Sequence, residues 1–398
     1  MRLEEMVSQR GSRSPRMKLL IAYPTLNSLG GAQRLCVHLM KTLAERKFRV
    51  TLATVDKTNW TALREVFAES FRPEGEFYLL PRVPEIPTLA LRQAFMALAY
   101  ILELLLITLK GDYDLLINMG GEVIDSMGDV VYINAIPLKL MHVYPKIQPT
   151  HAAQWGCYSR LYGSLTRVFR NHSSVIVTNS TSNQKIIQKY LGRTPLVVHP
   201  AVDVQRVRAS LPSEHRENVI VTLSRFRSAK DLEIIPSIAK RAEKSTFILV
   251  GTADRDSEEC LTAIARRTEN LGVQDRVQIL KNQPFSLVLE KLSTAKVFLH
   301  TQSHEAFGMA VVEAMAAGCV PVVPRYGGPW FDILDETQGK FGFAYQTPAE
   351  AADIINRLQD DDAMWRDISK RASVRANDYD RSIFERKMTD IVQRVVSS

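Results

Sequence analysis

Two glutamates in the stretch SHEAFGMAVVEAMAAGCVPVV, residues 303–323, are the first candidates for chemistry. Seven residues separate Glu305 from Glu313, and most of the stretch is small and apolar. We expect a strand to end near Gln302 and a helix to begin around Gly308, so that Glu305 lies in the loop between them. A carboxylate is costly to bury unless hydrogen-bond donors surround it. The hydroxyl groups of a sugar and a ribose would supply such donors.

The loop between the two glutamates also has the features of an anion site. Phe307, Gly308 and Met309 stand where the helix begins, and the backbone N–H groups at a helix N-terminus have no partner within the helix. A phosphate or an oxyanion is stabilised there. The loop follows the carboxyl end of a strand, and ligands of open α/β sheets bind along that edge.

Two cations follow another strand in the segment LSRFRSAKDLE, residues 223–233. Arg225 and Lys230 straddle a turn into a helix, which lets them grip a diphosphate. Arginine binds phosphate oxygens in pairs, whereas lysine acts as a mobile point charge. A nucleoside diphosphate gains negative charge as a sugar leaves it, so fixed cations there would stabilise the transition state. We expect Arg227, between them, to be a surface residue or a further phosphate ligand.

Two further loops have the composition of a ligand site. One follows a strand and could meet a nucleobase through its backbone groups; it contains Asn282, Gln283 and Pro284. The other contains Gly30 and Gly31, which open the first helix. A glycine pair permits positive φ and the close approach of a ligand. The pair lacks the G-x-G-x-x-G spacing of dinucleotide-binding folds, which argues against a dehydrogenase.

Strands that alternate with helices predict parallel sheets with helices on both faces. Two such runs follow one another, so we expect an α/β fold of two Rossmann-like domains facing each other across a cleft. The predicted strands of the first run are 18–23, 48–54, 113–120, 130–137, 173–180 and 195–203. The second run starts with 218–226 and a helix over 231–243, and its further predicted strands are 245–252, 276–282, 295–302 and 319–324. The predicted units are a disordered basic leader (1–16), an N-terminal domain (17–202), a C-terminal domain (203–375) and a terminal helix packing back on the N-terminal domain (376–398).

The composition is that of a soluble globular chain that favours anionic partners. Its 398 residues are 45% apolar and 24% charged, which suits two or three domains. The net charge of +8 favours nucleotides, phospholipid head groups or nucleic acid. The sequence has no run of Lys and Arg and no basic stripe with aromatic residues, which argues against a nucleic-acid-binding protein. The four cysteines are scattered, which is typical of reduced thiols in a cytosolic protein.

Residues 87–110, PTLALRQAFMALAYILELLLITLK, are long and apolar enough to suggest a membrane. Arg92, Gln93 and Glu103 interrupt the stretch, and a spanning helix tolerates few charges. We therefore expect a helix that packs on the sheet or lies on a membrane surface, with a true span as the less favoured alternative.

These motifs resemble the signature of family 4 retaining glycosyltransferases, which have the GT-B architecture. The resemblance rests on HEAFGMAVVEAMAAG, followed by CVPVV and GGP, and it extends over the whole folded chain. The form Ser-x-Phe-Arg-x-x-Lys of residues 224–230 is similar in particular to the mannosyltransferases that extend lipid-linked oligosaccharides in asparagine-linked glycosylation.

The resemblance implies a role for each candidate residue. Glu305 would face the donor sugar, and Glu313 would face the ribose hydroxyls. Arg225 and Lys230 would bind the donor diphosphate, so that the catalytic group comprises these two cations and Glu305. Residues 282–284 would meet the nucleobase.

The resemblance also implies what the two domains do. The Gly-Gly loop of the N-terminal domain would lie against the donor phosphates and shape the acceptor site. The N-terminal domain would then be the acceptor side, and the C-terminal domain would bind the nucleotide sugar.

The implied reaction moves a hexose, with mannose from GDP-mannose as the first choice, to a hydroxyl of a polyprenyl-linked glycan. A UDP-sugar donor with a polysaccharide or glycolipid acceptor is the alternative, and a non-catalytic protein of this fold is a remote one. The implied location is cytoplasmic, peripheral to the cytoplasmic face of a membrane. No cofactor beyond the donor substrate is expected, and no metal, although Asp254 and Asp256 superficially match an Asp-x-Asp motif.

One position departs from the resembling family. Many members carry a His after the strand that corresponds to VVYINAIP, and this chain has Asn134 there. Asparagine cannot act as a general base. His142 lies nearby and joins Asn134 as an acceptor-side candidate. A front-face mechanism, in which the leaving phosphate takes the acceptor proton, needs no protein base.

Overall fold

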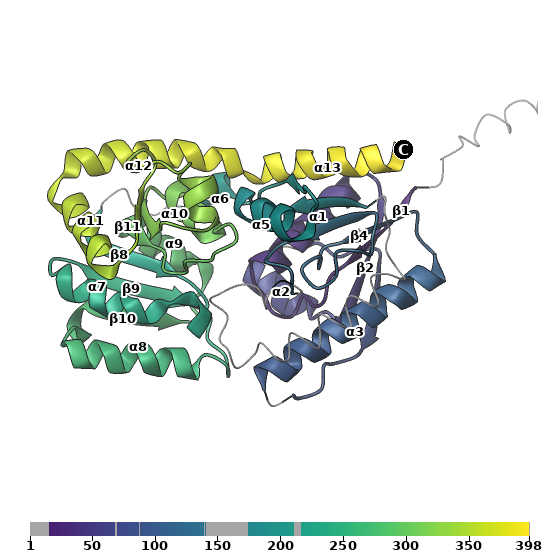
Figure 1. Cartoon of the computed structure of the whole chain (residues 1–398), viewed down its shortest axis with the longest axis horizontal. Helices are drawn as coiled ribbons and strands as arrows, with labels where there is room; N and C mark the ends of the chain where they lie inside the picture. The colour runs from purple at the N-terminus through teal and green to yellow at the C-terminus, as the bar shows by residue number, and fades with distance from the viewer. Residues whose placement is uncertain are drawn as a thin grey trace, which may run out of the picture.

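The structure, a computed structural model, describes residues 16–67, 70–86, 88–138, 140, 174–210 and 216–397. Within these residues the chain forms two parallel β-sheets flanked by helices, and the two lobes lie side by side (Figure 1). The α/β fold of two sheet domains predicted from the sequence is confirmed.

The N-terminal sheet has the strand order β3-β2-β1-β4-β5-β6-β7 in the described part of the chain. Central strands such as β4 and β5 are buried along their whole length, which explains their unbroken apolar sequences. The strands are β1 Lys18–Ala22, β2 Arg49–Asp56, β3 Gly75–Leu80, β4 Leu115–Asn118, β5 Val130–Ile133, β6 Val175–Thr178 and β7 Leu196–Val197. The helices are α1 Gly31–Glu45, α2 Trp60–Phe67, α3 Leu89–Lys110 and α5 Thr181–Leu191.

The C-terminal sheet has the order β10-β9-β8-β11-β12-β13. The strands are β8 Glu217–Leu223, β9 Thr246–Gly251, β10 Val277–Lys281, β11 Ala295–Leu299, β12 Val320–Pro324 and β13 Phe343–Tyr345. The helices are α6 Val204–Ala209, α7 Ile235–Arg241, α8 Glu258–Leu271, α9 Phe285–Thr294, α10 Met309–Ala316, α11 Pro348–Asp360 and α12 Asp362–Ala376. Short turns of 3₁₀ or π helix are η3 Ser228–Lys230, η4 Leu232–Ile234, η5 Gln274–Arg276, η6 Pro329–Ile333 and η7 Asn377–Tyr379.

The chain crosses between the two domains twice, at neighbouring places. The backbone of Val202 pairs with that of Asp380, and the N–H of Arg381 donates to the carbonyl of Val202 at 2.9 Å. The last helix, α13 Arg381–Ser397, then returns to the N-terminal domain, where Phe384 and Met388 belong to the core of the first sheet. In Figure 1, α12 and α13 run along one side of both lobes.

Two strands were not predicted, and both lie at the edge of a sheet. β3 is half-buried, and β13 has only three residues, so neither has a strong apolar pattern. The helix predicted over 231–243 begins later, at Ile235, after two 3₁₀ turns. Asp231 adopts a left-handed conformation with φ 53° between these turns, which interrupts a regular helix.

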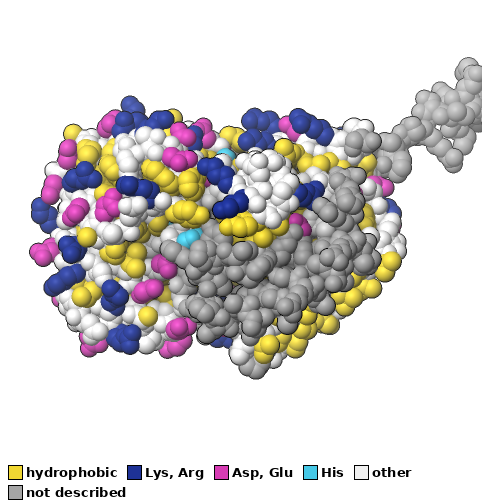
Figure 2. Space-filling model, viewed as in Figure 1, with side chains coloured by type: hydrophobic (Ala, Val, Ile, Leu, Met, Phe, Trp, Pro, Cys, Tyr) yellow, Lys and Arg dark blue, Asp and Glu magenta, His cyan; other side chains and the backbone are white. Residues whose placement is uncertain are grey.

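Helix α3 presents two different faces. Tyr100, Ile101 and Leu104 are buried against the sheet. The opposite face exposes leucines at spacings of seven, four, four and three residues, which fall on one side of a helix; these are Leu91, Leu98, Leu102, Leu106 and Leu109. Figure 2 shows hydrophobic side chains along the edge that α3 occupies in Figure 1. Residues 91–110 are long and apolar enough, by length and composition alone, to cross a membrane.

Candidate active site

An ion pair between Lys230 and Glu305 lies at the carboxyl edge of the C-terminal sheet. The two residues follow β8 and β11, which are neighbours in the sheet, so their loops meet at that edge. The Nζ atom of Lys230 is 2.8 Å from Oε2 of Glu305 and 2.5 Å from Oε1 of Gln302. The hydroxyl of Thr301 also donates to the carbonyl of Lys230 at 2.6 Å. The cation is therefore held from both its side chain and its backbone.

The electrostatics of this pair fix the charge of Glu305. Burial raises the pKa of Glu305, but the charge and hydrogen bond of Lys230, together with His300 and the N–H of Ala306, outweigh burial and lower that pKa to about 2. Burial lowers the pKa of the neighbouring His300 to about 4, and its Nε2 atom lies 4.0 Å from Oε2 of Glu305. At neutral pH the site therefore holds an ionised carboxylate beside a neutral imidazole. Such a carboxylate accepts hydrogen bonds and cannot act as a general acid.

Arg225 and Arg227 differ in the hydrogen-bond and ion-pair partners of their guanidinium groups. Arg227 donates two hydrogen bonds to Asp254, at 2.7 and 2.6 Å, and a third to Ser257 at 2.8 Å. Arg227 is thus held in an ion pair with Asp254, whose side chain is 59% exposed, and a role for Arg227 as a phosphate ligand stays a prediction. Arg225 is exposed, and in the described part of the chain no hydrogen bond or ion pair occupies its guanidinium. Arg225 therefore remains available to an anion.

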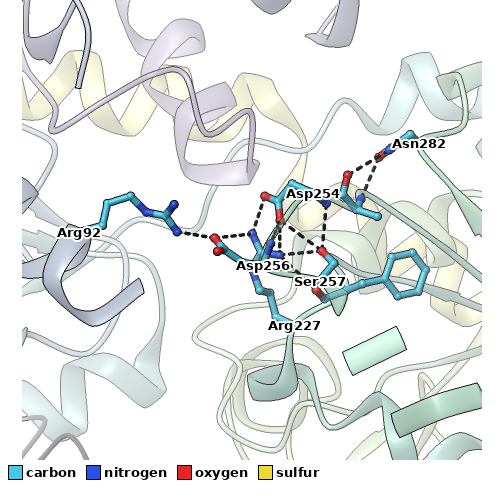
Figure 3. A network of polar contacts seen from close by, with 8 residues as sticks. Arg92, Arg227, Asp254, Asp256, Ser257 and Asn282 are labelled. Carbon is cyan, nitrogen blue, oxygen red and sulfur yellow. Dashed lines mark hydrogen bonds and ion pairs between the residues drawn. The ribbon is translucent and has the colours of Figure 1, made fainter. Parts of the chain in front are cut away.

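The same network reaches the loop after β10 (Figure 3). Asn282 adopts φ 53°, and its side chain accepts from the N–H of Ala253 and donates to the carbonyl of Ala253. Asp256, two residues beyond Asp254, pairs with Arg92 of α3 in the other domain. The two carboxylates of the Asp-x-Asp sequence are therefore both bound by arginines.

The start of α10 is tightly built. Gly308 has φ 101°, and a Cβ atom there would lie 2.9 Å from Cγ of Pro329, so only glycine fits. The Phe307 ring is buried and stacks on His199 at 5.3 Å, so its side chain is part of the core. The groups that Phe307 and Gly308 could offer to a ligand are therefore those of the backbone.

Glu313 and Met309 of α10 both contact the N-terminal domain. Oε1 of Glu313 lies 2.5 Å from Nη2 of Arg34, which is on α1. A Cβ atom on Gly31 would lie 3.1 Å from Sδ of Met309, so the glycine allows α1 and α10 to approach closely. The two domains thus touch directly at the predicted donor residues.

The C-terminal domain is similar to a known protein family. The family described as "Glycosyl transferases group 1" matches residues 203–375. Residues 203–375 are a glycosyl transferases group 1 domain. They contain every predicted donor residue except the glycine pair.

The chain is similar in part of its sequence to named proteins and over most of its length to a known fold. It is 25% identical over 262 residues to the "GDP-Man:Man(3)GlcNAc(2)-PP-Dol alpha-1,2-mannosyltransferase" of Dictyostelium discoideum, covering 60% of this chain and 51% of that protein. The human protein of the same name is 29% identical over 237 residues, covering 55% and 48%. The chain thus spans about half the length of these relatives. Its fold matches the Anabaena HepE crystal structure with UDP and glucose (TM-score 0.68, 19% identity, 95% and 100% covered), which confirms the GT-B fold.

The N-terminal candidates differ from expectation in detail. Neither Gly30 nor Gly31 adopts positive φ; the strained residue of that loop is Leu29, with φ 48°. The glycine pair therefore does not use the positive φ that glycine permits, and close packing against Met309 explains Gly31 instead. Asn134 uses its side-chain Nδ2 to donate to the carbonyl of Met119 at 2.9 Å. His142 lies outside the described residues.

Some residues of the site were not predicted. A small pocket beside the group 1 domain's Glu305 is lined by both domains, including Asn183 and Ile136. Arg34 is the clearest omission, although the sequence carried a signal for it. A cation in the first turns of a helix opposes the helix dipole, so it indicates an anionic partner elsewhere.

No metal cluster can be assigned. In the described ranges, no group of three or more His, Cys, Asp and Glu side chains lies close enough together to hold a metal ion.

Proposed function

We propose that this chain is a retaining glycosyltransferase that moves mannose from GDP-mannose to a hydroxyl of a polyprenyl-linked glycan. The observation that carries the proposal is the ionised Glu305 held by Lys230 at the ligand-binding edge of a group 1 domain. The choice of GDP-mannose and of a lipid-linked acceptor is supported by the names of the relatives.

Each donor residue then has a task that its surroundings permit. Arg225, which is exposed, and Lys230 bind the diphosphate, and both cations stabilise the charge that develops as the anomeric bond breaks. Glu305 accepts hydrogen bonds from the mannose hydroxyls. Glu313 binds the ribose with its second oxygen, because Arg34 occupies the first.

Backbone groups bind the nucleobase and the phosphate of the donor. Gly308 and Met309 provide N–H groups at the start of α10, where an anion is favoured. Asn282 fixes the loop that faces the base through its contacts with Ala253, and Gln283 and Pro284 line the same loop. The Gly30-Gly31 loop closes the site from the N-terminal domain.

We also propose that α3 lies on the cytoplasmic surface of a membrane. Its exposed leucines occupy one face, and the chain carries a net charge of +8. Apolar burial and attraction to anionic lipids together give peripheral binding. This location would bring a lipid-linked acceptor to the cleft.

The activity is tested with purified protein, GDP-mannose and a polyprenyl-diphosphate-linked glycan, with the nucleotide product read by mass spectrometry. GDP release that depends on the acceptor is expected. Glu305→Ala should abolish transfer while the protein stays folded, although with a lower unfolding temperature because the ionised carboxylate is lost, while Glu313→Gln should weaken GDP binding about tenfold. Glu269→Gln, at an exposed position of α8, is the matched control and should retain full activity.

The same experiment separates the alternatives. Release of UDP from a UDP-sugar, together with a larger thermal shift by UDP than by GDP, would favour the second donor class. No release from any nucleotide sugar, or equal activity of the Glu305 and Glu313 variants, would overturn the proposal.

A further inference from the structure

A carboxylate that the donor chemistry does not use lies at the carboxyl edge of the N-terminal sheet. Glu122 follows β4, and two glycines carry the chain into position. A Cβ atom on Gly120 would come within 2.7 Å of the Tyr100 ring, and one on Gly121 within 2.8 Å of the carbonyl of Tyr132. Only glycines let the backbone pass between α3 and β5. The loop therefore delivers Glu122 to the end of β5.

The fold holds one oxygen of this carboxylate in place. The backbone N–H of Asn134, just after β5, donates to Oε2 of Glu122 at 3.3 Å. The backbone carbonyl of Glu122 accepts from the N–H of Leu138 at 2.8 Å. Glu122 is half-buried, and in the described part of the chain no ion pair neutralises it. Its remaining hydrogen-bonding capacity is open to a ligand.

Asn134 itself is committed to the fold. Its side-chain amide donates to the carbonyl of Met119, and its own carbonyl accepts from Nδ2 of Asn179 at 2.5 Å. Of the two residues, Asn134 anchors the loop, whereas Glu122 carries the charge. Glu122 is therefore better placed than Asn134 for the acceptor-binding role that was expected of Asn134.

The hydroxyl of Tyr23 feels the charges of both Glu122 and Arg225. Tyr23 follows β1, and burial raises the pKa of its hydroxyl well above the usual range. The nearby Glu122 charge raises that pKa further, and the Arg225 charge lowers it. One phenol therefore lies within electrostatic reach of both Glu122 in one domain and Arg225 in the other.

The surroundings of Glu122 bring the pKa of its carboxyl group close to neutral pH. Burial raises the pKa of Glu122 to about 7, and the N–H groups of Glu122 and Asn134 lower it in part. Its charge raises the pKa of three buried phenols: Tyr23, just after β1, Tyr100 on α3 and Tyr132 on β5. Tyr100 and Tyr132 donate their hydroxyls to other acceptors, Asn118 and Val198. A hydroxyl ligand would supply the missing donor.

We propose that Glu122 binds a hydroxyl group of the acceptor sugar, opposite the donor diphosphate. The assignment rests on the proposed glycosyltransferase function. A carboxylate without a cationic partner selects uncharged polyols and repels phosphates, so a neutral terminal sugar fits here, and the diphosphate of a lipid carrier lies elsewhere. The bond to the sugar hydroxyl is charge-assisted in the ionised form and weaker in the protonated form.

The test is Glu122→Gln, which keeps an oxygen for the Asn134 N–H and removes the charge. The probe is a soluble Man(3)GlcNAc(2) glycan without lipid, measured by calorimetry in the presence of GDP and as an acceptor for transfer. The variant should bind the glycan about tenfold more weakly at pH 8, the effect of losing one charge-assisted hydrogen bond. GDP binding and the unfolding temperature should stay unchanged. Glu45→Gln, at an exposed position of α1, is the control.

The pH profile distinguishes a binding role from a structural one. For the wild-type protein, kcat/KM for the acceptor should rise through about pH 7 as Glu122 ionises, and Glu122→Gln should lose this rise. Equal glycan affinity and equal pH profiles in both proteins would overturn the assignment. So would a parallel loss of glycan and GDP binding with lower stability, since that result indicates a loop anchor only. Glycan binding without transfer from GDP-mannose would instead refute the proposed donor and leave Glu122 supported.

Discussion

Nη2 of Arg34 on α1 and Oε1 of Glu313 on α10 lie 2.5 Å apart, although 279 residues separate them in the chain. Both side chains are largely buried, with 20% and 13% of their surfaces exposed. Burial lowers the pKa of the Arg34 guanidinium, but Glu313 outweighs it and the pKa rises overall. This pair joins the two domains at the residue proposed to bind the ribose.

Arg34→Ala should therefore destabilise the protein by about 1–2 kcal/mol, because it leaves a largely buried carboxylate without its cation. Urea unfolding of Arg34→Ala, Glu313→Gln and the double variant measures the coupling between them. We expect a coupling energy of about 1–2 kcal/mol. Additive effects of the two substitutions would contradict a direct interaction.

Glu305 should make stability depend on acid pH. Its pKa in the folded protein is about 2, below the ordinary value of 4.5, so its ionisation favours the folded state. The contribution, roughly 3 kcal/mol, is present above about pH 4.5 and lost as the pH falls towards 2. Denaturant unfolding at pH 7 and pH 3 checks it: Glu305→Gln should be less stable than wild type at pH 7, and the difference should shrink at pH 3. A constant difference would show that Lys230 does not stabilise the carboxylate.

The contact between Arg92 and Asp256 should influence domain closure. Arg92→Glu places like charges together at a site where both side chains are about one-fifth exposed. The repulsion, about 1 kcal/mol, should raise the donor KM about fivefold and increase the radius of gyration in small-angle X-ray scattering. Arg82→Glu changes the same charge where the side chain is 86% exposed, and it should alter neither quantity. Identical behaviour of the two variants would argue against an interdomain role for Arg92.

The exposed leucines of α3 should determine membrane binding. Replacing Leu102, Leu106 and Leu109 with Gln removes apolar area that burial in lipid would stabilise by about 1.5–3 kcal/mol for each side chain. Cosedimentation with phosphatidylcholine vesicles containing phosphatidylserine should fall more than about tenfold, while GDP binding is retained. Val374→Gln, at an exposed apolar position of α12, is the control. Undiminished cosedimentation of the triple variant would exclude α3 as the docking face.

The sequence by itself determined the elements that carry the donor residues. Buried parallel strands are apolar runs, and functional loops follow their carboxyl ends, so the positions of Lys230 and Glu305 could be predicted from local pattern. The half-buried β3 and the three-residue β13 could not, because edge strands bury too little to leave a pattern. Gly308 was placed correctly at a helix start for the same local reason.

Only the tertiary structure decided which side chains meet across the two domains. Arg34 with Glu313, and Arg92 with Asp256, depend on how the sheets are oriented towards each other, and no local periodicity encodes that orientation. Glu122 belongs to the same class: its environment comes from β1, β5 and α3 together. A charge acquires its role from the burial and partners that long-range packing gives it, and these become visible only once the chain is folded.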